Sequence, residues 1–149
     1  MYTIEEFDKM KTKVLKYVLF KKRTEYEVMQ KFKNTIEPNL LEDIIQDLKE
    51  NSYINDDEYI NRAVSEFIAI NTLSIKEIKY KLRSKGVSSS LIEDYIDKNY
   101  EELIEYEKDN AYKIFQKKKL SQDADKIKNY LRSKGYLDEN IKQVVNGGE

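Results

Sequence analysis

The chain of 149 residues contains no cysteine, no histidine and no tryptophan. The lack of cysteine excludes disulfide bonds and thiolate chemistry, and it is consistent with a reducing compartment. The lack of both cysteine and histidine removes the common general base, the thiol nucleophile and the usual zinc ligands. Neither a P-loop nor a GxGxxG motif occurs. We therefore expect a protein that is not an enzyme and that needs no metal and no cofactor.

Long apolar runs are also missing, since no stretch approaches the roughly 20 residues that cross a bilayer. The chain begins MYTIEEFDKMK, with early acidic residues and no apolar segment of the kind that a signal peptide has. We therefore expect a cytoplasmic protein. Lysine and arginine number 27 against 28 acidic residues, a formal net charge of −1. This balance argues against a protein whose main affinity comes from neutralising many phosphates.

Glycine and proline are scarce, at four and one. Apolar residues recur three or four positions apart without sustained alternation, which indicates an all-α fold. Several helix starts are marked in the sequence. Thr24-x-x-Glu27 and Ser74-x-x-Glu77 are capping boxes, in which the hydroxyl and the carboxylate each bind a free backbone N–H. Asp123 is a good N-cap without the partner glutamate.

One segment, LRSKG, occurs at 82–86 and again at 131–135, 49 residues apart. The apolar pattern around it extends in both directions and recurs once more near the start of the chain, where Thr35-Ile36 replaces Lys-Gly. In the two LRSKG copies the glycine stands where a helix ends in a left-handed residue. We therefore predict three tandem three-helix repeats that stack into one elongated, curved array. Their boundaries are 1–50, 51–99 and 100–149.

Each predicted repeat has a long first helix followed by two shorter helices. The first helices are expected at about 3–20, 56–71 and 101–119. The second helices are expected at about 24–34, 74–85 and 123–134. The third helices are expected at about 38–50, 88–98 and 138–146. Pairs four residues apart mark the buried side of the first helices: Val14 and Val18, Ala63 and Phe67, Ala111 and Phe115.

The densest acidic cluster is Asp56-Asp57-Glu58. Carboxylates of this kind are able to bind magnesium. Acidic residues in the first turn of a helix also complement the helix dipole and cap its free N–H groups. We favour this structural role, with Asn55 or Asp56 as the N-cap.

Basic residues gather on the second helices of the last two repeats, whereas the third helices are acidic or mixed. Aligned second helices would form a basic stripe able to meet an acidic protein surface or a phosphate backbone. A solvated helix face with lysines near its negative end explains the same residues. Tyr80 lies opposite the apolar side of its helix and suits an interface. The candidate partner-binding residues are Lys76, Lys79, Tyr80, Lys81, Arg83, Lys126, Lys128 and Arg132.

Four segments carry motifs that occur together: RTEYEVMQKF at 23–32, SYINDDEYI at 52–60, LRSKGV at 82–87 and LRSKGY at 131–136. In combination they resemble the RecX family of bacterial recombination regulators, and the resemblance covers roughly residues 15–145. Val28 stands where the family usually has leucine, and Ser52 where its turn usually has glycine.

The resemblance implies a three-repeat helical protein that binds the RecA recombinase. Family members contact the RecA–DNA filament along its groove and suppress strand exchange, ATP hydrolysis and coprotease activity, so they modulate recombination and the SOS response. We therefore expect RecA and the RecA–DNA filament as partners, and any direct contact with DNA to be weak. We also expect a monomer that does not associate with membranes.

Two other readings remain open from the sequence. Second and third helices joined by a short turn superficially suit a helix-turn-helix-like transcription regulator. The third helices, which would read the DNA, are however acidic and would be repelled by phosphates. A generic scaffold resembling HEAT or TPR arrays lacks those families' signatures.

Overall fold

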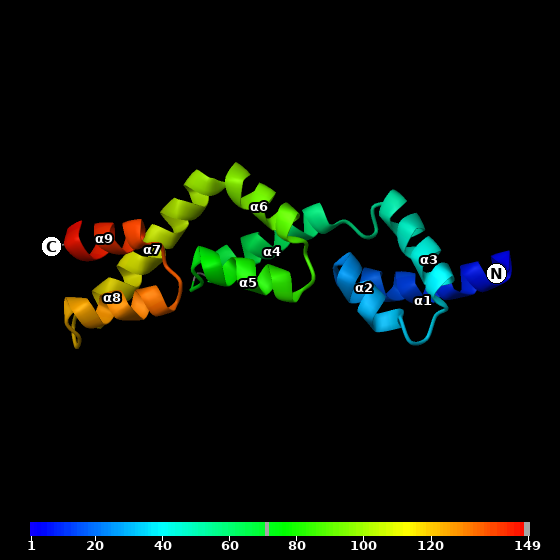
Figure 1. The fold of residues 1–149 in the computed structure, drawn as a ribbon, viewed down its shortest axis with the longest axis horizontal. Helices are drawn as coiled ribbons and strands as arrows, with labels where there is room; N and C mark the ends of the chain where they lie inside the picture. The colour runs from blue at the N-terminus through cyan, green and yellow to red at the C-terminus, as the bar shows by residue number, and fades with distance from the viewer. Residues whose placement is uncertain (71, 148–149) are drawn as a thin grey trace. The chain divides into compact units, whose positions relative to one another are not determined.

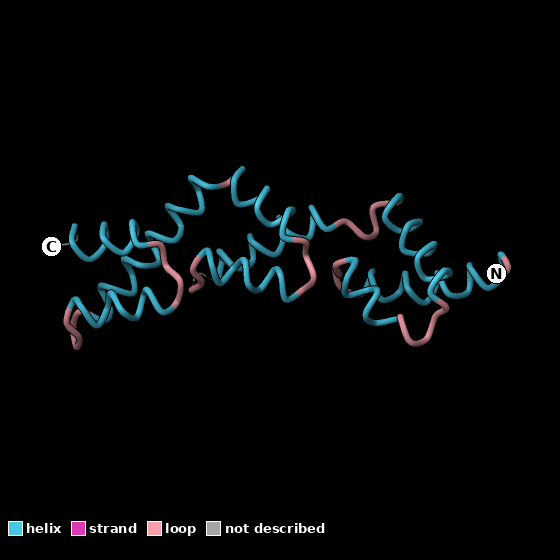
Figure 2. Tube along the Cα trace, in the orientation of Figure 1, coloured by secondary structure: helices cyan, strands magenta, loops and turns pink. Residues whose placement is uncertain are grey.

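The fold is all-α in the computed structural model, which describes residues 1–70 and 72–147. Within these residues there are nine helices and no strand (Figures 1 and 2). Every predicted helix is confirmed with ends within two residues, except that residue 71, a predicted helix end, lies outside the described residues. The helices are α1 (Ile4–Phe20), α2 (Glu25–Phe32), α3 (Pro38–Glu50), α4 (Asp56–Ile70), α5 (Ile75–Ser84), α6 (Ser89–Lys98), α7 (Tyr100–Lys118), α8 (Ala124–Ser133) and α9 (Asp138–Gly147).

The predicted helix caps are also confirmed. Thr24 Oγ1 accepts from the Glu27 N–H at 3.1 Å, and Glu27 Oε1 accepts from the Thr24 N–H at 3.0 Å. Ser74 and Glu77 form the same reciprocal pair at 3.1 and 3.0 Å. Asp123 Oδ1 accepts one backbone N–H at 2.9 Å. These local hydrogen bonds explain why the second helices begin where they do.

The chain divides into two compact units. Unit 1 comprises Met1–Arg62 and Arg83–Ser88, and unit 2 comprises Ala63–Leu82 and Ser89–Glu149.

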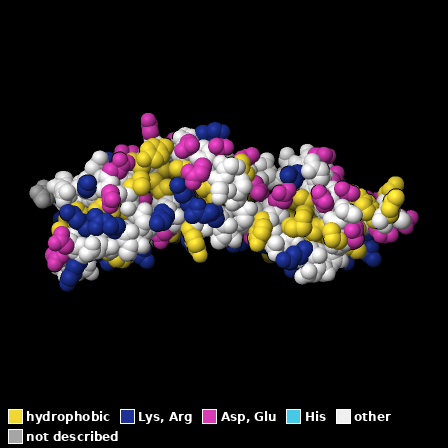
Figure 3. Space-filling model, viewed as in Figure 1, with side chains coloured by type: hydrophobic (Ala, Val, Ile, Leu, Met, Phe, Trp, Pro, Cys, Tyr) yellow, Lys and Arg dark blue, Asp and Glu magenta, His cyan; other side chains and the backbone are white. Residues whose placement is uncertain are grey.

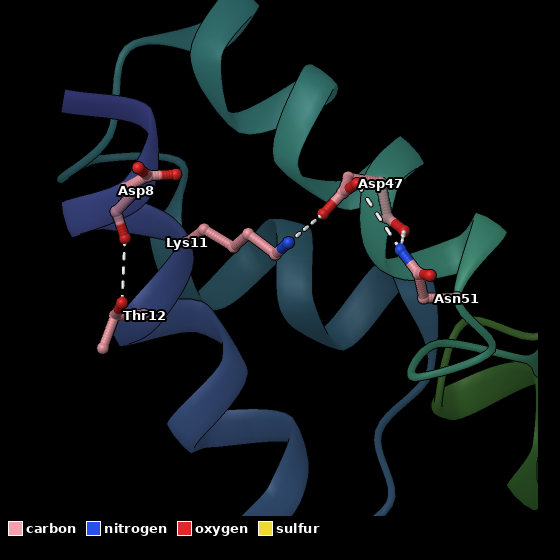
Figure 4. A network of polar contacts seen from close by, with 5 residues as sticks. All are labelled: Asp8, Lys11, Thr12, Asp47 and Asn51. Atoms are coloured by element: carbon pink, nitrogen blue, oxygen red, sulfur yellow. Dashed lines mark hydrogen bonds and ion pairs between the residues drawn. The ribbon is translucent and has the colours of Figure 1, made fainter. Parts of the chain in front are cut away.

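In unit 1, helices α1, α2 and α3 pack against one another around a common apolar core (Figure 1). Polar contacts add to the packing of α1 on α3: Tyr2 donates to Asp43, and Lys11 forms an ion pair with Asp47 (Figure 4). The buried core residues are Val14, Val18, Val28, Ile36, Leu40, Leu41, Ile44, Ile45, Leu48 and Ile54.

In unit 2, helix α7 packs against α6, α8 and α9, and α8 packs against α9. The buried residues between them are Ala111, Phe115, Ile127, Leu131, Tyr136, Ile141, Val144 and Val145.

The predicted buried pairs of α1 and α7 are confirmed. The prediction for α4 was wrong, because Ile60 and Val64 are buried whereas Ala63 and Phe67 are only half-buried. Both pairs are spaced four residues apart, and the buried pair lies three residues before the predicted one.

The turn before α4 contains the only non-glycine residue with positive φ among the described residues, Ser52, at φ +62°. A positive φ raises the conformational free energy of a residue that has a Cβ atom, whereas glycine adopts it without this cost. We expect Ser52→Gly to stabilise unit 1 by up to about 1 kcal/mol. The free energy of unfolding from chemical denaturation measures the change. The matched control is Ser90→Gly in the first turn of α6, an exposed helical position where the same change should destabilise.

The acidic cluster at the start of α4 has a structural role. Asn55 is the N-cap, because its Oδ1 accepts from the Glu58 N–H at 3.1 Å. Asp56 instead accepts from the Glu25 N–H at 3.0 Å, which links the start of α4 to the start of α2. Burial raises the pKa of Asp56 above its ordinary value, and the bond from Glu25 opposes that rise.

Candidate partner-binding surface

Helix α5 carries five of the eight candidate residues. By the helical step of about 100° per residue, Lys76, Lys79 and Tyr80 share one side of the helix, and Arg83 continues it one turn later. Tyr80 is the most exposed of the α5 aromatic and apolar side chains, at 70%. Lys81 lies on the opposite flank of the buried stripe formed by Ile75, Ile78 and Leu82. The helix therefore gathers four candidates and separates the fifth.

Helix α8 carries the other three candidates. Lys128 and Arg132 are four residues apart and share one side, at positions equivalent to Lys79 and Arg83 in the repeat. Lys126 lies on another side of the helix, at the position that Glu77 occupies in α5. The α8 contribution to a common face is therefore the pair Lys128 and Arg132.

Two candidates have acidic neighbours. Lys79 Nζ lies 3.4 Å from Glu93 Oε1, and Arg132 Nε lies 3.3 Å from Asp138 Oδ1. Exposed ion pairs of this kind contribute about 0–1 kcal/mol. A stronger acidic partner is therefore able to displace them at little cost.

The end of α8 meets the start of α5. Ser74 Oγ donates to the Lys134 carbonyl oxygen at 2.7 Å, so this hydroxyl both caps α5 and binds the end of α8. Gly135 lies against the Lys76 side chain so closely that an added Cβ would be 2.9 Å from Lys76 Cβ. The cations Lys134 and Lys76 are thus neighbours at one junction. On the face shown in Figure 3, dark-blue side chains lie over α8 and over α5.

A buried carboxylate fixes the start of α5. Glu107 of α7 is fully buried, and its Oε1 accepts from the Ile75 N–H at 3.1 Å. Its Oε2 accepts from Asn140 Nδ2 at 2.6 Å and from the Leu137 N–H at 3.3 Å. One side chain therefore joins α7, the first residue of α5 and the first turn of α9.

Unit 1 contains an equivalent junction. Thr24 Oγ1 donates to the Lys85 carbonyl oxygen at 2.6 Å, as Ser74 does to Lys134. Gly86 has φ +86° and lies directly against the Tyr26 side chain. The end of the LRSKG segment therefore docks on the start of a second helix in both units.

Several contributors to this surface were not among the predicted residues. Lys134 lies at the α8–α5 junction, and it is the lysine of the second LRSKG segment, at 131–135. Tyr130 has Lys118 Nζ 4.1 Å and Lys134 Nζ 5.8 Å from its ring centroid, both within cation–π range. Glu107 was also missed. The sequence indicated its burial only indirectly, because Glu107 lies four residues from each of the apolar residues Leu103 and Ala111 and therefore on the same side of α7.

The described part of the chain lacks the features of two other kinds of site. Over residues 1–70 and 72–147, no three His, Cys, Asp or Glu side chains are grouped as metal ligands would be. Over the same residues, no helix is both long and apolar enough to cross a bilayer.

Comparison with known proteins gives the family. No protein-family model matches the chain. It is 31% identical over 125 residues to "Regulatory protein RecX" of Streptococcus agalactiae serotype III (strain NEM316), covering 82% of this chain and 48% of that protein. The chain belongs to the RecX family. Another member, from Staphylococcus epidermidis, is 28% identical over 156 residues, covering 98% of this chain and 57% of the member. The chain spans about half the length of these curated RecX relatives.

Solved RecX structures share the fold. The crystal structure of RecX from Lactobacillus salivarius superposes with a TM-score of 0.83 and covers 97% of both chains at 23% identity. A second crystal structure, of regulatory protein RecX, gives a TM-score of 0.78 and covers 94% of this chain and 73% of that one. The fold of this chain is therefore RecX-like, and the relatives carry the name of a regulatory protein.

Proposed function

We propose that the chain consists of three three-helix repeats, 1–50, 51–99 and 100–149, whose second helices follow one another in a curved line. Support comes from the two equivalent junctions. Thr24 and Ser74 occupy the same position in successive repeats, and each caps its own helix while binding the carbonyl of a Lys-Gly helix end. A contact that recurs at the repeat spacing is what a linear array requires.

We further propose that the chain is a non-catalytic regulator that binds RecA and the RecA–DNA filament and inhibits ATP hydrolysis, strand exchange and coprotease activity. Family membership supports regulation, and the RecA partner follows from the resemblance described above. The observation that carries the binding site is the continuity of cations across the α8–α5 junction, from Arg132 and Lys134 to Lys76 and Lys79. Three predictions from the sequence stay predictions: the protein is a monomer, it lies in the cytoplasm, and it needs no cofactor.

The chemistry of this surface fits a partner with an acidic groove. Cations on a rim steer association and fix the register between partners more than they add raw affinity. Tyr80, exposed among these cations, is the kind of aromatic side chain that interface cores favour. Such a surface inhibits by occupying the filament and needs no reacting group.

The first experiment titrates the chain into the single-strand-DNA-dependent ATPase reaction of RecA, with DNA binding by the chain alone measured in the same buffer. We expect inhibition at concentrations where the chain does not itself coat the DNA. Absence of inhibition, together with tight salt-sensitive binding to duplex DNA alone, would instead favour a helix-turn-helix-like transcription regulator.

Charge reversal tests the surface. We expect Arg83→Glu together with Arg132→Glu to raise the concentration for half-inhibition about tenfold, because buried arginines at interfaces often contribute this much. The control is Lys98→Glu with Lys142→Glu, which changes the charge equally at exposed positions of α6 and α9. Circular dichroism verifies that both variants fold. Unchanged inhibition by the arginine variant would exclude these residues from the interface.

A further inference from the structure

The outward side of α1 carries a second group of cations, outside the surface described above. Lys9, Lys13 and Lys16 recur at spacings of four and three residues, so they form a stripe along one side of the helix. The buried residues Val14 and Val18 lie on the opposite side. All three lysines are exposed, and within the described residues none of them forms an ion pair. We call these three residues and Phe20 the α1 stripe.

The packing of unit 1 fixes the direction of this stripe. Lys11, which lies between the stripe lysines in sequence, points toward α3 and pairs with Asp47 (Figure 4). The lysines that help α1 to pack are therefore distinct from those of the stripe. The last turn of α1 contains no basic residue, so the stripe is not the cluster of cations that commonly compensates the helix dipole.

An aromatic side chain ends the stripe. Phe20 follows Lys16 by one turn and is 86% exposed, and the neighbouring Leu19 is 63% exposed. Burial stabilises most phenylalanine side chains, and Phe20 with Leu19 instead exposes apolar surface to solvent at the end of a row of cations. Lys21, also exposed, follows directly.

This combination discriminates between classes of partner. A membrane surface is disfavoured because the apolar side of α1 is covered by α2 and α3 and cannot enter the lipid interface. An acidic polypeptide would use the lysines but has no evident use for the ring. A single-stranded nucleic acid uses both, since its phosphates follow a row of point charges and an unstacked base lies on an aromatic face.

We propose that the α1 stripe binds a single-stranded nucleic acid, with backbone phosphates along Lys9, Lys13 and Lys16 and a base stacked on Phe20. The binding is weak and salt-dependent, because only about three phosphates are neutralised. This inference does not rest on RecA binding, since the stripe lies on a different helix from the candidate partner-binding surface.

The test is fluorescence anisotropy of labelled (dT)20, (rU)20 and a 20-base-pair DNA duplex, titrated with the full chain over a series of salt concentrations. We expect Lys13→Gln with Lys16→Gln to weaken binding of both single strands and to reduce the salt slope by about 1.4, because each phosphate that a lysine neutralises on a single strand adds about 0.7 to that slope. Phe20→Ala should weaken single-strand binding about tenfold and leave the slope unchanged. The comparison of DNA with RNA assigns the natural ligand to the strand that binds more tightly.

Matched controls at exposed positions of α7 are Lys113→Gln with Lys117→Gln, the same change of charge, and Tyr112→Ala, which also removes an exposed aromatic ring. These controls should bind like the unchanged chain. Equal losses in the α7 and α1 variants would overturn the proposal, as would duplex binding as tight as single-strand binding. Competition by polyglutamate at the same concentration of charge as by (dT)20 would assign the stripe to an acidic polypeptide and likewise overturn it.

Discussion

Replacing Glu107 by leucine is expected to destabilise unit 2 by about 3 kcal/mol or more, because two buried donors and one partly buried donor lose their acceptor at once. These donors are the Ile75 N–H, the Leu137 N–H and Asn140 Nδ2. A buried donor left without a partner costs about 1–3 kcal/mol, and leucine supplies no acceptor. The free energy of unfolding from chemical denaturation, followed by circular dichroism, measures the loss.

Two variants separate the lost hydrogen bonds from other effects. Glu107→Gln keeps one acceptor oxygen and nearly the same shape, so we expect it to lose clearly less stability than Glu107→Leu. Glu105→Leu makes the same change on the exposed side of α7, where only the ion pair to Lys108 is lost, and we expect a change within about 1 kcal/mol. Similar values for Glu107→Leu and Glu105→Leu would show that the buried carboxylate does not stabilise the unit.

The role of Glu107 links stability to the candidate partner-binding surface. Ile75 is the first residue of α5, so the carboxylate holds the helix that carries Lys76, Lys79 and Tyr80. The Ser74 hydroxyl holds the same helix end from the side of α8. The cations of the two helices therefore keep fixed positions because buried polar groups, and not the lysines themselves, determine the geometry.

Local signals explain why so much of the fold was predictable. Capping boxes, left-handed glycines and apolar spacing act over a few residues, and all of them stand in the sequence. Within the described residues they located the helix ends to within two residues, and the predicted end of α4 at residue 71 lies outside those residues. The exact side that α4 buries was mispredicted because two adjacent apolar pairs have the same spacing, and only tertiary packing selects Ile60 and Val64.

Long-range polar contacts could not be predicted in the same way. The capping role of Thr24 follows from Glu27 three residues later, but its second hydrogen bond goes to Lys85, 61 residues away. Nothing near Thr24 in the sequence indicates that partner. The repeat offered an indirect signal, since both a capping hydroxyl and a Lys-Gly helix end recur at the repeat spacing.

The candidate surface was predicted in part by composition and refined by geometry. Counting charges selected the second helices as candidates but did not distinguish their sides. Helical geometry alone shows that Lys81 and Lys126 lie on other sides of their helices than the remaining candidates. The neighbourhood of Lys134 and Lys76 needed the structure, because the two residues meet only through the junction at Ser74 and Gly135.

Replacing Gly86 by alanine is the second change with a large expected effect, at about 3 kcal/mol of lost stability in unit 1. Its φ of +86° costs about 1 kcal/mol or more for any residue with a Cβ atom. The added Cβ would also lie 2.2 Å from Tyr26 Cβ and Cγ, so α2 or the end of α5 would have to move. The free energy of unfolding from chemical denaturation measures the sum of both effects.

Gly135 and Gly147 provide a graded comparison for this prediction. Gly135→Ala has a similar φ of +90° but a nearest approach of 2.9 Å to the Lys76 stem, so we expect a smaller loss than at Gly86. Gly147→Ala places its Cβ in open space within a helix and should be neutral or slightly stabilising. Equal losses at Gly86 and Gly135 would mean that backbone conformation alone matters. The predicted order instead assigns the glycine of LRSKG two functions, which are to end its own helix and to let that end dock on the next second helix.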